Sequence, residues 1–384
     1  MKYFRLNEEI YFVPGKRPSL YNLFTGDVYL ISEENANKLM EAENGNSISN
    51  YKDDKFFELL KDKGYGDFYS DKVFIEKINL TPDWYDYLYF KPAPMISRVT
   101  LKLANCQYKC DNCNVNKYKR YSPCLCNSKE TNNKNTLTTE KIYKYLINLK
   151  KLDISELVVS GFSSSNLDKN AIIRNALELG FDSVRYIHCY NDIQKIDHIG
   201  LAKQGALVYL QVNQNEIDEE VLKEILDLNR EKTTILLQVR FEEEDPLKYI
   251  NFFNQNNISY IIDFVFNSRI KQNNISSLYN KEIPKVSADI FSLVRKRNKC
   301  LVGTFATLSN GDIVPCLGLK DFKVGTIDKL YDIFSEDKLL KYWDMSSREI
   351  AQCKDCGLRY ACNDCRSLEI RLGAKIDEKI SCMR

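Results

Sequence analysis

The chain has few of the residues on which several common classes of protein depend. It holds only two histidines in 384 residues, so sites that need imidazole as base or metal ligand have little to draw on. Its 55 basic and 53 acidic residues nearly cancel, for a formal net charge of +2, which removes the electrostatic case for nucleic acid. No stretch approaches the roughly 20 apolar residues of a membrane helix, and the start MKYFRLNEEIYF does not resemble a signal peptide. We therefore expect a cytoplasmic protein with no membrane and no nucleic acid among its partners.

Cysteine, in contrast, is abundant, with 13 residues. Disulfides are not expected in a reducing compartment, and an isolated cysteine such as Cys189 in VRYIHCY can be a small buried hydrophobic residue. Close spacing needs another explanation. Cys106, Cys110 and Cys113 form one group, and the tail holds a second set: Cys300, Cys316, Cys353, Cys356, Cys362, Cys365 and Cys382. Thiolate-only sites for zinc or for iron–sulfur clusters explain both groups.

The first predicted domain covers residues 1–78. EEIYFVPG and SLYNLFTGDVYLIS alternate in strand fashion around turn signals. SEENANKLMEAENG predicts a helix from an N-cap at Ser32 to Gly45, DDKFFELLKDKG predicts a second helix, and DFYSDKVFIEKI predicts a returning wing strand. This order indicates a small winged-helix domain, followed by a linker over residues 79–94.

Residues 95–285 alternate between strands and helices, which predicts the α/β fold class. The expected strands SRVTLKLA, SELVVSG, SVRYIHC, ALVYLQVN, TTILLQVRF and SYIIDFVF are mostly apolar, as in a parallel sheet covered on both faces. Six β/α units favour a partial or full barrel. Because the first strand runs directly into Cys106, its cysteine group is placed at the carboxyl end of that strand, where β/α barrels hold their chemistry.

Residues 286–384 read as a loop-rich, cysteine-rich domain with little core of its own. A domain of this size with so few buried side chains would be weakly stable alone. Metal ligation would supply the missing folding free energy.

The C-x3-C-x2-C spacing of Cys106, Cys110 and Cys113 after a first strand resembles the signature of radical S-adenosylmethionine (SAM) enzymes. The resemblance implies a partial (β/α)6 radical-SAM barrel in which these cysteines hold a [4Fe–4S] cluster and its open iron binds SAM. It also implies cleavage of SAM to a 5′-deoxyadenosyl radical that abstracts hydrogen from a substrate. Structural cysteines or a zinc site are the alternative for this group.

Two places depart from the family pattern. Asn112 stands where the family usually has an aromatic residue, and SGFSSS stands where a Gly-Gly-Glu-Pro-like segment usually contacts SAM. Backbone carbonyls or serine hydroxyls of SGFSSS could bind the ammonium of SAM instead. The candidate SAM contacts, each of which could equally be an ordinary loop residue, are Ser160, Gly161, Asn191, Gln211, Asn213 and Arg240.

The tail resembles the SPASM domain, the auxiliary-cluster module of radical enzymes that modify peptides. The resemblance implies two further [4Fe–4S] clusters, three in all, with a distal one on Cys353, Cys356, Cys362 and Cys382. The proximal one would be held by Cys300, Cys316 and Cys365, one thiolate short. A substrate thiolate, or one of Cys124, Cys126 and Cys189, could complete it. Zinc remains an alternative for C-x2-C pairs.

Residues 1–78 resemble the peptide-recognition domains of pathways that modify ribosomally made peptides. In these domains a leader peptide adds as a strand to a small sheet, so that main-chain hydrogen bonds give affinity. The alternative is a DNA-binding winged helix, which the neutral net charge disfavours.

Taken together, these features predict a radical SAM peptide maturase that forms a thioether, carbon–carbon or carbon–oxygen cross-link on a precursor peptide. The leader would bind residues 1–78, and a reductase, flavodoxin or ferredoxin would donate electrons. A non-catalytic, cluster-bearing peptide-binding partner and a sulfatase-type protein maturase are the alternatives. His188 and His198 are expected to be structural or surface residues.

Overall fold

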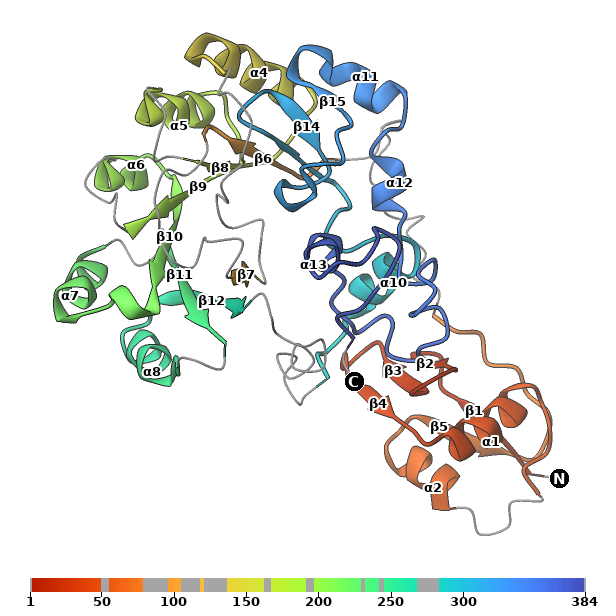
Figure 1. The fold of residues 1–384 in the computed structure, drawn as a ribbon. Coiled ribbons are helices and arrows are strands. Elements are labelled where there is room, and N and C mark those ends of the chain that lie inside the picture. The colour runs from red at the N-terminus through yellow and green to blue at the C-terminus, as the bar shows by residue number, and fades with distance from the viewer. Residues whose placement is uncertain are drawn as a thin grey trace.

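The computed structural model describes residues 2–49, 55–78, 96–104, 118–120, 137–161, 167–190, 197–228, 232–241, 245–267 and 283–382. An N-terminal unit, a large sheet with flanking helices and a cysteine-rich tail follow one another along the chain. The tail lies between the other two parts (Figure 1). The architecture is mixed α/β with a large parallel sheet, as the sequence predicts.

The described part of the N-terminal unit holds two small antiparallel sheets and two helices. β2, β3 and β4 form one sheet, and β1 pairs with β5 in the other. Helix α1 confirms its predicted ends, because Ser32 accepts a hydrogen bond from the Asn35 amide and Gly45 follows the helix at φ +88°. The winged-helix assignment of this unit stays a prediction. The bounds are β1 Tyr3–Leu6, β2 Ile10–Val13, β3 Ser19–Asn22, β4 Val28–Leu30, α1 Glu33–Glu43, α2 Lys55–Asp62 and β5 Gly66–Tyr69.

Six parallel strands form the centre of the large sheet, in the order β6-β8-β9-β10-β11-β12. All six were expected from the sequence. The described strands follow one another in a linear order with β15 and β7 at the ends, so the described residues build an open sheet and not a closed barrel. The bounds are β6 Arg98–Lys102, β7 Tyr118–Arg120, β8 Glu156–Ser160, β9 Ser183–Cys189, β10 Leu207–Asn213, β11 Thr233–Arg240 and β12 Ser259–Asn267.

Helices α4 to α8 lie along the outer side of the curved sheet (Figure 1). Alternate strand residues such as Leu101, Leu157 and Val184 point toward these helices and form the largest buried cluster with them. The helical patterns of TTEKIYKYLINLKKL, NAIIRNALELG, EEVLKEILDLNRE and PLKYINFFNQN predict α4, α5, α7 and α8, whereas α6 was not predicted. The bounds are α4 Thr139–Lys151, α5 Lys169–Glu178, α6 His198–Lys203, the 3-10 helix η5 Gln214–Glu216, α7 Glu219–Asp227 and α8 Leu247–Gln255.

The first half of the tail extends the large sheet. β13 pairs in parallel with β6, and β14 and β15 follow in antiparallel order. The expectation of little core in the tail is therefore wrong for this half, since Phe305, Ile313 and Trp343 belong to the same buried cluster as β6 and α4. The bounds are α10 Ala288–Lys296, β13 Thr304–Thr307, β14 Asp312–Val314, η7 Leu317–Leu319, β15 Gly325–Thr326, η8 Ile327–Lys329, α11 Leu330–Ser335, α12 Leu340–Trp343 and α13 Arg366–Arg371.

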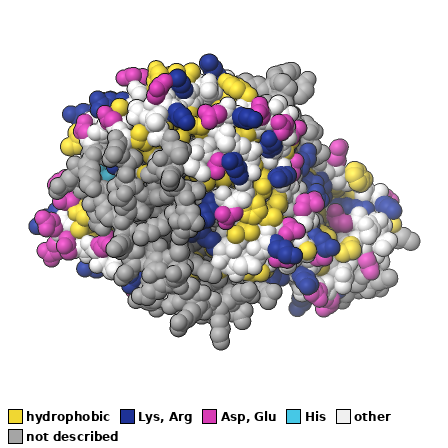
Figure 2. All heavy atoms as spheres, turned by 45° about the horizontal axis from the view of Figure 1, so that its top comes forward, with side chains coloured by type: hydrophobic (Ala, Val, Ile, Leu, Met, Phe, Trp, Pro, Cys, Tyr) yellow, Lys and Arg dark blue, Asp and Glu magenta, His cyan; other side chains and the backbone are white. Residues whose placement is uncertain are grey.

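Charged side chains of both signs are interspersed over the described part of the face in Figure 2, in keeping with the balanced composition. Among the described residues, the helices are all too short or too polar to cross a membrane.

Candidate functional site

The carboxyl end of β6 leads into the predicted SAM-cluster loop. Cys106, Cys110 and Cys113 lie outside the described residues, as do Asn191, Cys124 and Cys126. What the structure describes is the place from which that loop departs. β6 occupies the sheet between β8 and β13, and its last strand residue, Lys102, is paired with Ser160.

Gly161 lies directly against the point where the chain leaves β6. Its φ of +87° belongs to the left-handed region, and a Cβ there would lie 2.4 Å from the carbonyl oxygen of Ala104. The adjacent Ser160 is buried, and its carbonyl accepts a hydrogen bond from the Leu103 amide at 2.8 Å. Only glycine permits this close approach of two backbones. Two of the predicted SAM contacts are thus held beside the residues that precede the cysteine loop.

Three further predicted SAM contacts end neighbouring strands. Gln211 and Asn213 are buried near and at the end of β10, and Arg240 is the last residue of β11. Side chains alternate between the two faces of a strand. Because Leu210, Val212 and Val239 pack on the helix side, Gln211, Asn213 and Arg240 face the opposite, inner side. Gln211 Nε2 is 3.5 Å from Cys189 Sγ at the end of β9.

The same inner face carries three buried polar residues that the sequence reasoning missed. Lys102 ends β6 and is 3% exposed, while Gln238 and Asp263 lie on β11 and β12 and are fully buried. In register, Gln238 is paired with both Asn213 and Asp263. Burying an ionisable or amide group is costly unless it is paired. A charged or amide residue inside an otherwise apolar strand, as in YIIDFVF, was the available signal. The carboxyl edge of the sheet is therefore polar on its inner side and suited to a polar ligand.

The two histidines lie on the other face of the sheet. His188 in β9 is buried, and its ring centre is 5.0 Å from that of His198 in α6. Tyr186, which belongs to the helix-side core, has its hydroxyl 2.7 Å from Nδ1 of His198. Both histidines therefore take part in packing α6 on the sheet, in agreement with the structural role expected of them.

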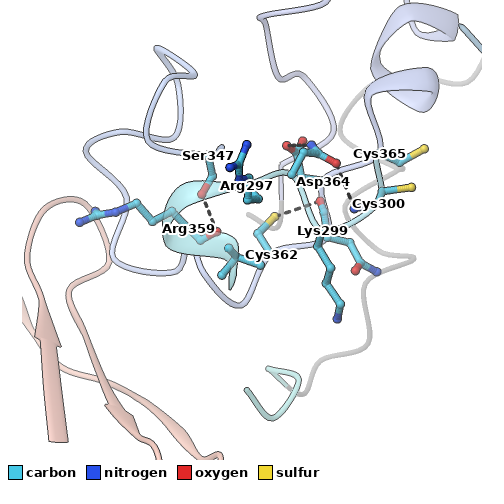
Figure 3. Close-up of a pocket in the computed structure, with 11 residues that line it drawn as sticks. Arg297, Lys299, Cys300, Ser347, Arg359, Cys362, Asp364 and Cys365 are labelled. Atoms are coloured by element: carbon cyan, nitrogen blue, oxygen red, sulfur yellow. Dashed lines mark hydrogen bonds between the residues drawn. The ribbon is translucent and has the colours of Figure 1, made fainter. Parts of the chain in front are cut away.

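In the tail, Cys300 and Cys365 lie side by side. Their sulfur atoms point the same way in Figure 3. The hydrogen bond with Cys300 lowers the pKa of Cys365 to about 7, against the effect of burial. Asn298 fixes the backbone at Cys300, since its Oδ1 accepts hydrogen bonds from the amides of Cys300 and Leu301 at 3.0 and 3.1 Å. We call Cys300 and Cys365 the first thiol group.

Cys316 directly precedes η7, which packs against α13. Cys365 is the N-cap residue of α13. Cys316, the third residue predicted for the proximal cluster, thus lies next to η7, which contacts the helix α13 that Cys365 caps. Cys189 lies at the polar inner face of the large sheet.

A second thiol group consists of Cys353, Cys362 and Cys382. Burial raises the pKa of Cys353 to about 12, and the charges of Cys362 and Cys382 act in the same direction, which places the three thiols near one another. Cys353 is 7% exposed. The fourth residue of the predicted distal set, Cys356, is on the neighbouring turn, where its backbone bridges to Lys16.

A buried charge network fixes the chain around the second thiol group. Glu369 in α13 accepts hydrogen bonds from the amides of Ile380 and Ser381 at 2.7 and 3.0 Å and from Lys379 Nζ at 3.2 Å. Burial opposes ionisation of Glu369, but Lys379 and the bonds from residues 380 and 381 hold its pKa below the usual value. Arg366 is bonded to Asp364 and to the carbonyl of Glu378. Because Cys382 follows Ser381 directly, this network sets its position.

A cavity of about 290 Å³ lies beside both groups, and its walls include Cys300, Cys362 and Cys365. Figure 3 shows Cys362 pointing away from the Cys300–Cys365 pair, and its sulfur lies 3.5 Å from the carbonyl oxygen of Asn363. The eight described cysteines form no disulfide.

Thiols are the donor type that iron–sulfur clusters and structural zinc sites use. Within the described ranges, no three His, Cys, Asp or Glu side chains converge closely enough to enclose a metal ion. The tail cysteines therefore supply the donor atoms that an iron–sulfur cluster or a zinc ion needs, and they lie in two sets. As placed, the thiols of the described residues are too far apart to form a closed ligand shell. The division of the tail cysteines into a distal and a proximal ligand set, which the resemblance to the SPASM domain implies, stays a prediction.

Comparisons with known proteins find a likeness only among solved structures. No protein-family model matches the chain, and no curated protein matches it. Among solved structures, it is similar to Streptococcus suis SuiB bound to S-adenosylmethionine, with 13% sequence identity over 97% of each chain and a TM-score of 0.44. A likeness at this level does not establish a shared fold or activity, so the functional conclusion has to come from the residues themselves.

Proposed function

We propose that this chain is a radical SAM enzyme that modifies a ribosomally synthesised precursor peptide. The observation that carries the proposal is the position of the end of β6, the strand that precedes the C-x3-C-x2-C segment in the sequence. This strand end lies at the carboxyl edge of six parallel strands, beside Gly161 and next to a buried polar inner face. In β/α folds this edge is where ligands bind.

Cys106, Cys110 and Cys113 would hold the SAM-binding [4Fe–4S] cluster. When bound and reduced, this cluster supplies the electron that cleaves SAM into methionine and a 5′-deoxyadenosyl radical. The chain's own part would be to hold SAM. Ser160 and Gly161 would offer a hydroxyl and backbone groups to its ammonium, and Gln211, Asn213 and Arg240 would offer polar contacts from neighbouring strands. Asn191, which follows β9 by two positions in the sequence, is a further candidate contact.

The tail would hold two auxiliary clusters. Cys353, Cys356, Cys362 and Cys382 are proposed for the distal cluster, and Cys300, Cys316 and Cys365 for the proximal one. The lowered pKa of Cys365 favours the thiolate that a metal requires. The cavity beside Cys300 and Cys365 leaves room for a substrate side chain, so a peptide thiolate could supply the fourth proximal ligand.

The N-terminal unit would bind the leader of the precursor. β4 pairs with β3 along one side and is an end strand of its sheet, so its free main-chain groups could pair with an added peptide strand. Leu30 on β4 is 42% exposed and Phe24 in the preceding turn is 72% exposed, offering apolar contact to such a strand. A reductase, flavodoxin or ferredoxin would supply electrons, and the product would be a thioether, carbon–carbon or carbon–oxygen cross-link.

The first test is the formation of 5′-deoxyadenosine. The protein is reconstituted with iron and sulfide without oxygen, reduced with dithionite and given SAM, and the products are measured by mass spectrometry. The matched control replaces Cys106, Cys110 and Cys113 by alanine, which leaves the tail intact. We expect 5′-deoxyadenosine from the unchanged chain and none above background from the control.

Iron content separates the alternatives. About twelve irons per chain are expected for three clusters, and about eight for the control. Full iron without 5′-deoxyadenosine, with or without a candidate precursor peptide, would instead support the non-catalytic peptide-binding partner. Turnover of a leaderless protein substrate would support the sulfatase-type maturase.

A further inference from the structure

The turn between β2 and β3 lies against the tail loop that carries Cys353 and Cys356. The amide of Lys16 donates a hydrogen bond to the carbonyl of Asp355 at 2.6 Å, and the amide of Gly357 donates one to the carbonyl of Lys16 at 2.8 Å. Together they form a parallel β-bridge between Lys16 and Cys356. The backbone on both sides of Cys356 is thus bonded to a single residue of the N-terminal unit.

Buried aromatic side chains reinforce this junction. Tyr21 in β3 is fully buried, and its hydroxyl donates a hydrogen bond to the carbonyl of Gly357 at 2.8 Å. Its ring packs on Phe291 of α10 at 5.1 Å between ring centres and on Tyr360 at 6.0 Å. Val13 and Leu23 from the same hairpin belong to this cluster. The contact is therefore a packed core between the hairpin and the tail, and not a loose surface contact.

Two glycines make the close approach possible. Gly15 has φ +116°, and a Cβ there would lie 2.3 Å from the carbonyl oxygen of Asp355. A Cβ on Gly357 would lie 2.1 Å from the carbonyl oxygen of Arg17. Both obstacles are backbone atoms, which cannot move aside as a flexible side chain could. The fit is consequently specific at the level of single atoms on both partners.

We propose that the β2–β3 turn positions the Cys353–Cys356 loop, so that the N-terminal unit is a structural part of the second thiol group's metal site. The loop needs such support because its described residues lie in turns, outside any helix or strand, and buried backbone groups need partners. Metal ligands also bind well only when their supports hold them in place. The inference rests on the proposed function only in taking Cys353 and Cys356 as metal ligands.

The test uses the full chain with Gly15→Ala, which adds the clashing Cβ at the junction. Gly373→Ala is the matched control, since Gly373 also has a positive φ, +95°, but nothing lies within 4 Å of its Cβ position. Both substitutions place a side chain at a positive φ, and only Gly15→Ala disturbs the junction. Tyr21→Phe provides a milder variant that removes a single hydrogen bond and keeps the packing, in case Gly15→Ala folds poorly.

The main readout is alkylation of the metal-free, reduced protein by iodoacetamide, located by mass spectrometry. Gly15→Ala should raise the rate of alkylation at Cys353 and Cys356 by about tenfold or more relative to Gly373→Ala, the effect expected from losing two backbone hydrogen bonds. It should leave the rates at Cys300 and Cys365 unchanged. Tyr21→Phe should raise the rate at Cys353 and Cys356 roughly threefold to tenfold. This readout needs no SAM chemistry, so it stands even if the radical activity proves absent.

Metal content gives a second, independent reading. After reconstitution with iron and sulfide, Gly15→Ala should hold about four irons fewer than Gly373→Ala, one cluster's worth. Equal alkylation of Cys353 and Cys356 in both glycine variants and in Tyr21→Phe would overturn the proposal. An iron loss in Gly15→Ala without faster alkylation of these cysteines would overturn it too, because the defect would then lie elsewhere.

Discussion

The two thiol groups of the tail contain the same residue type in opposite environments. Cys300 and Cys365 line a cavity and share a hydrogen bond, which lowers the pKa of Cys365 to about 7. Cys353 is buried beside Cys362 and Cys382, and its pKa rises to about 12. A thiol partner in hydrogen-bond reach stabilises a thiolate, whereas burial among other thiols destabilises it. Spacing in the sequence does not reveal this difference.

The contrast matters for metal binding, because a thiol must lose its proton to become a ligand. The first group is ready to do so at neutral pH and is open to the cavity. The second group depends on a metal, and on the cations Arg366 and Lys379 that surround it, to offset the cost of its charge. It is also the group whose chain is held by the Glu369 network and by the N-terminal hairpin.

The sharpest test of this contrast is the rate of alkylation in metal-free protein. At pH 7 about half of the Cys365 thiol, but only about one part in 10⁵ of Cys353, is thiolate. Since more basic thiolates are better nucleophiles, we expect Cys365 to react with iodoacetamide on the order of 10²–10³ times faster. The urea-unfolded chain is the control, where both should react alike. Similar rates in the folded chain would remove the contrast.

Glu369→Gln should lower the free energy of unfolding by about 3 kcal/mol, because it leaves the buried Lys379 with only the more distant carboxylate of Asp364, at 3.7 Å. Urea unfolding of the reduced, metal-free protein measures this. Glu140→Gln is the control, since Glu140 pairs with Lys144 on the surface of α4 and such a pair contributes at most about 1 kcal/mol. In Glu369→Gln, Cys382 should also become more reactive, while Cys300 should not. An equal effect of the two substitutions would show that the network does not hold the second group.

Asn298→Ala should affect the first group, and by less. It removes the acceptor of the Cys300 and Leu301 amides and the donor to Asp364, which lies 2.9 Å away. The expected loss of unfolding free energy is about 1–3 kcal/mol, the cost of buried partners left unpaired. The pKa of Cys365 should shift as Cys300 moves, which the pH dependence of alkylation reports.

Asn310→Ala is the matched control for Asn298→Ala. Asn310 makes the same kind of local bond, to the Asp312 amide at 3.0 Å, in a turn without cysteine. It should leave the reactivity of every tail cysteine unchanged. If Asn310→Ala altered Cys365 as strongly as Asn298→Ala, the assignment of Asn298 as the support of the first group would be wrong.

Lowering the pH should reduce the free energy of unfolding through Glu369, which supports the second thiol group. The pKa of Glu369 is held below its usual value of 4.5 in the folded chain, so this carboxylate contributes stability that is fully present above pH 4.5 and is lost as the pH falls through its lower, folded-state pKa. We expect the unfolding free energy of the unchanged chain to fall below pH 4.5 more steeply than that of Glu369→Gln. Parallel curves for the two proteins would contradict this.

The pattern of apolar strands and capped helices predicted much of the fold. All six parallel strands, helix α1 with its Ser32 cap and the helices α4, α5, α7 and α8 follow from local signals that neighbouring residues carry. Three short strands, β13 to β15, do not follow from such local signals. Their 2 to 4 residues become strands by pairing with β6 and with one another, and a segment of that length carries no periodicity of its own.

The residues of the candidate site also fall into those that the sequence indicated and those that it did not. Resemblance to the SPASM domain divided the tail cysteines into two sets, and the family pattern after the second expected strand indicated Ser160 and Gly161 in SGFSSS. Lys102, Gln238 and Asp263 were missed because each stands alone within an apolar strand, and the register of β6, β11 and β12 brings them to one face. Polar residues from separate strands meet only through pairing across the sheet.

By itself, the sequence determined the class of fold, the order of the parallel strands and the soft donors available for a metal, since these depend on residue type and local spacing. The tertiary structure alone decided that the tail shares the core of the large sheet, that Gly15 and Gly357 bring the N-terminal hairpin onto the Cys353–Cys356 loop, and that two groups of identical thiols differ in pKa. Burial and hydrogen bonding between residues that are distant in the sequence set these properties, and no local pattern contains them.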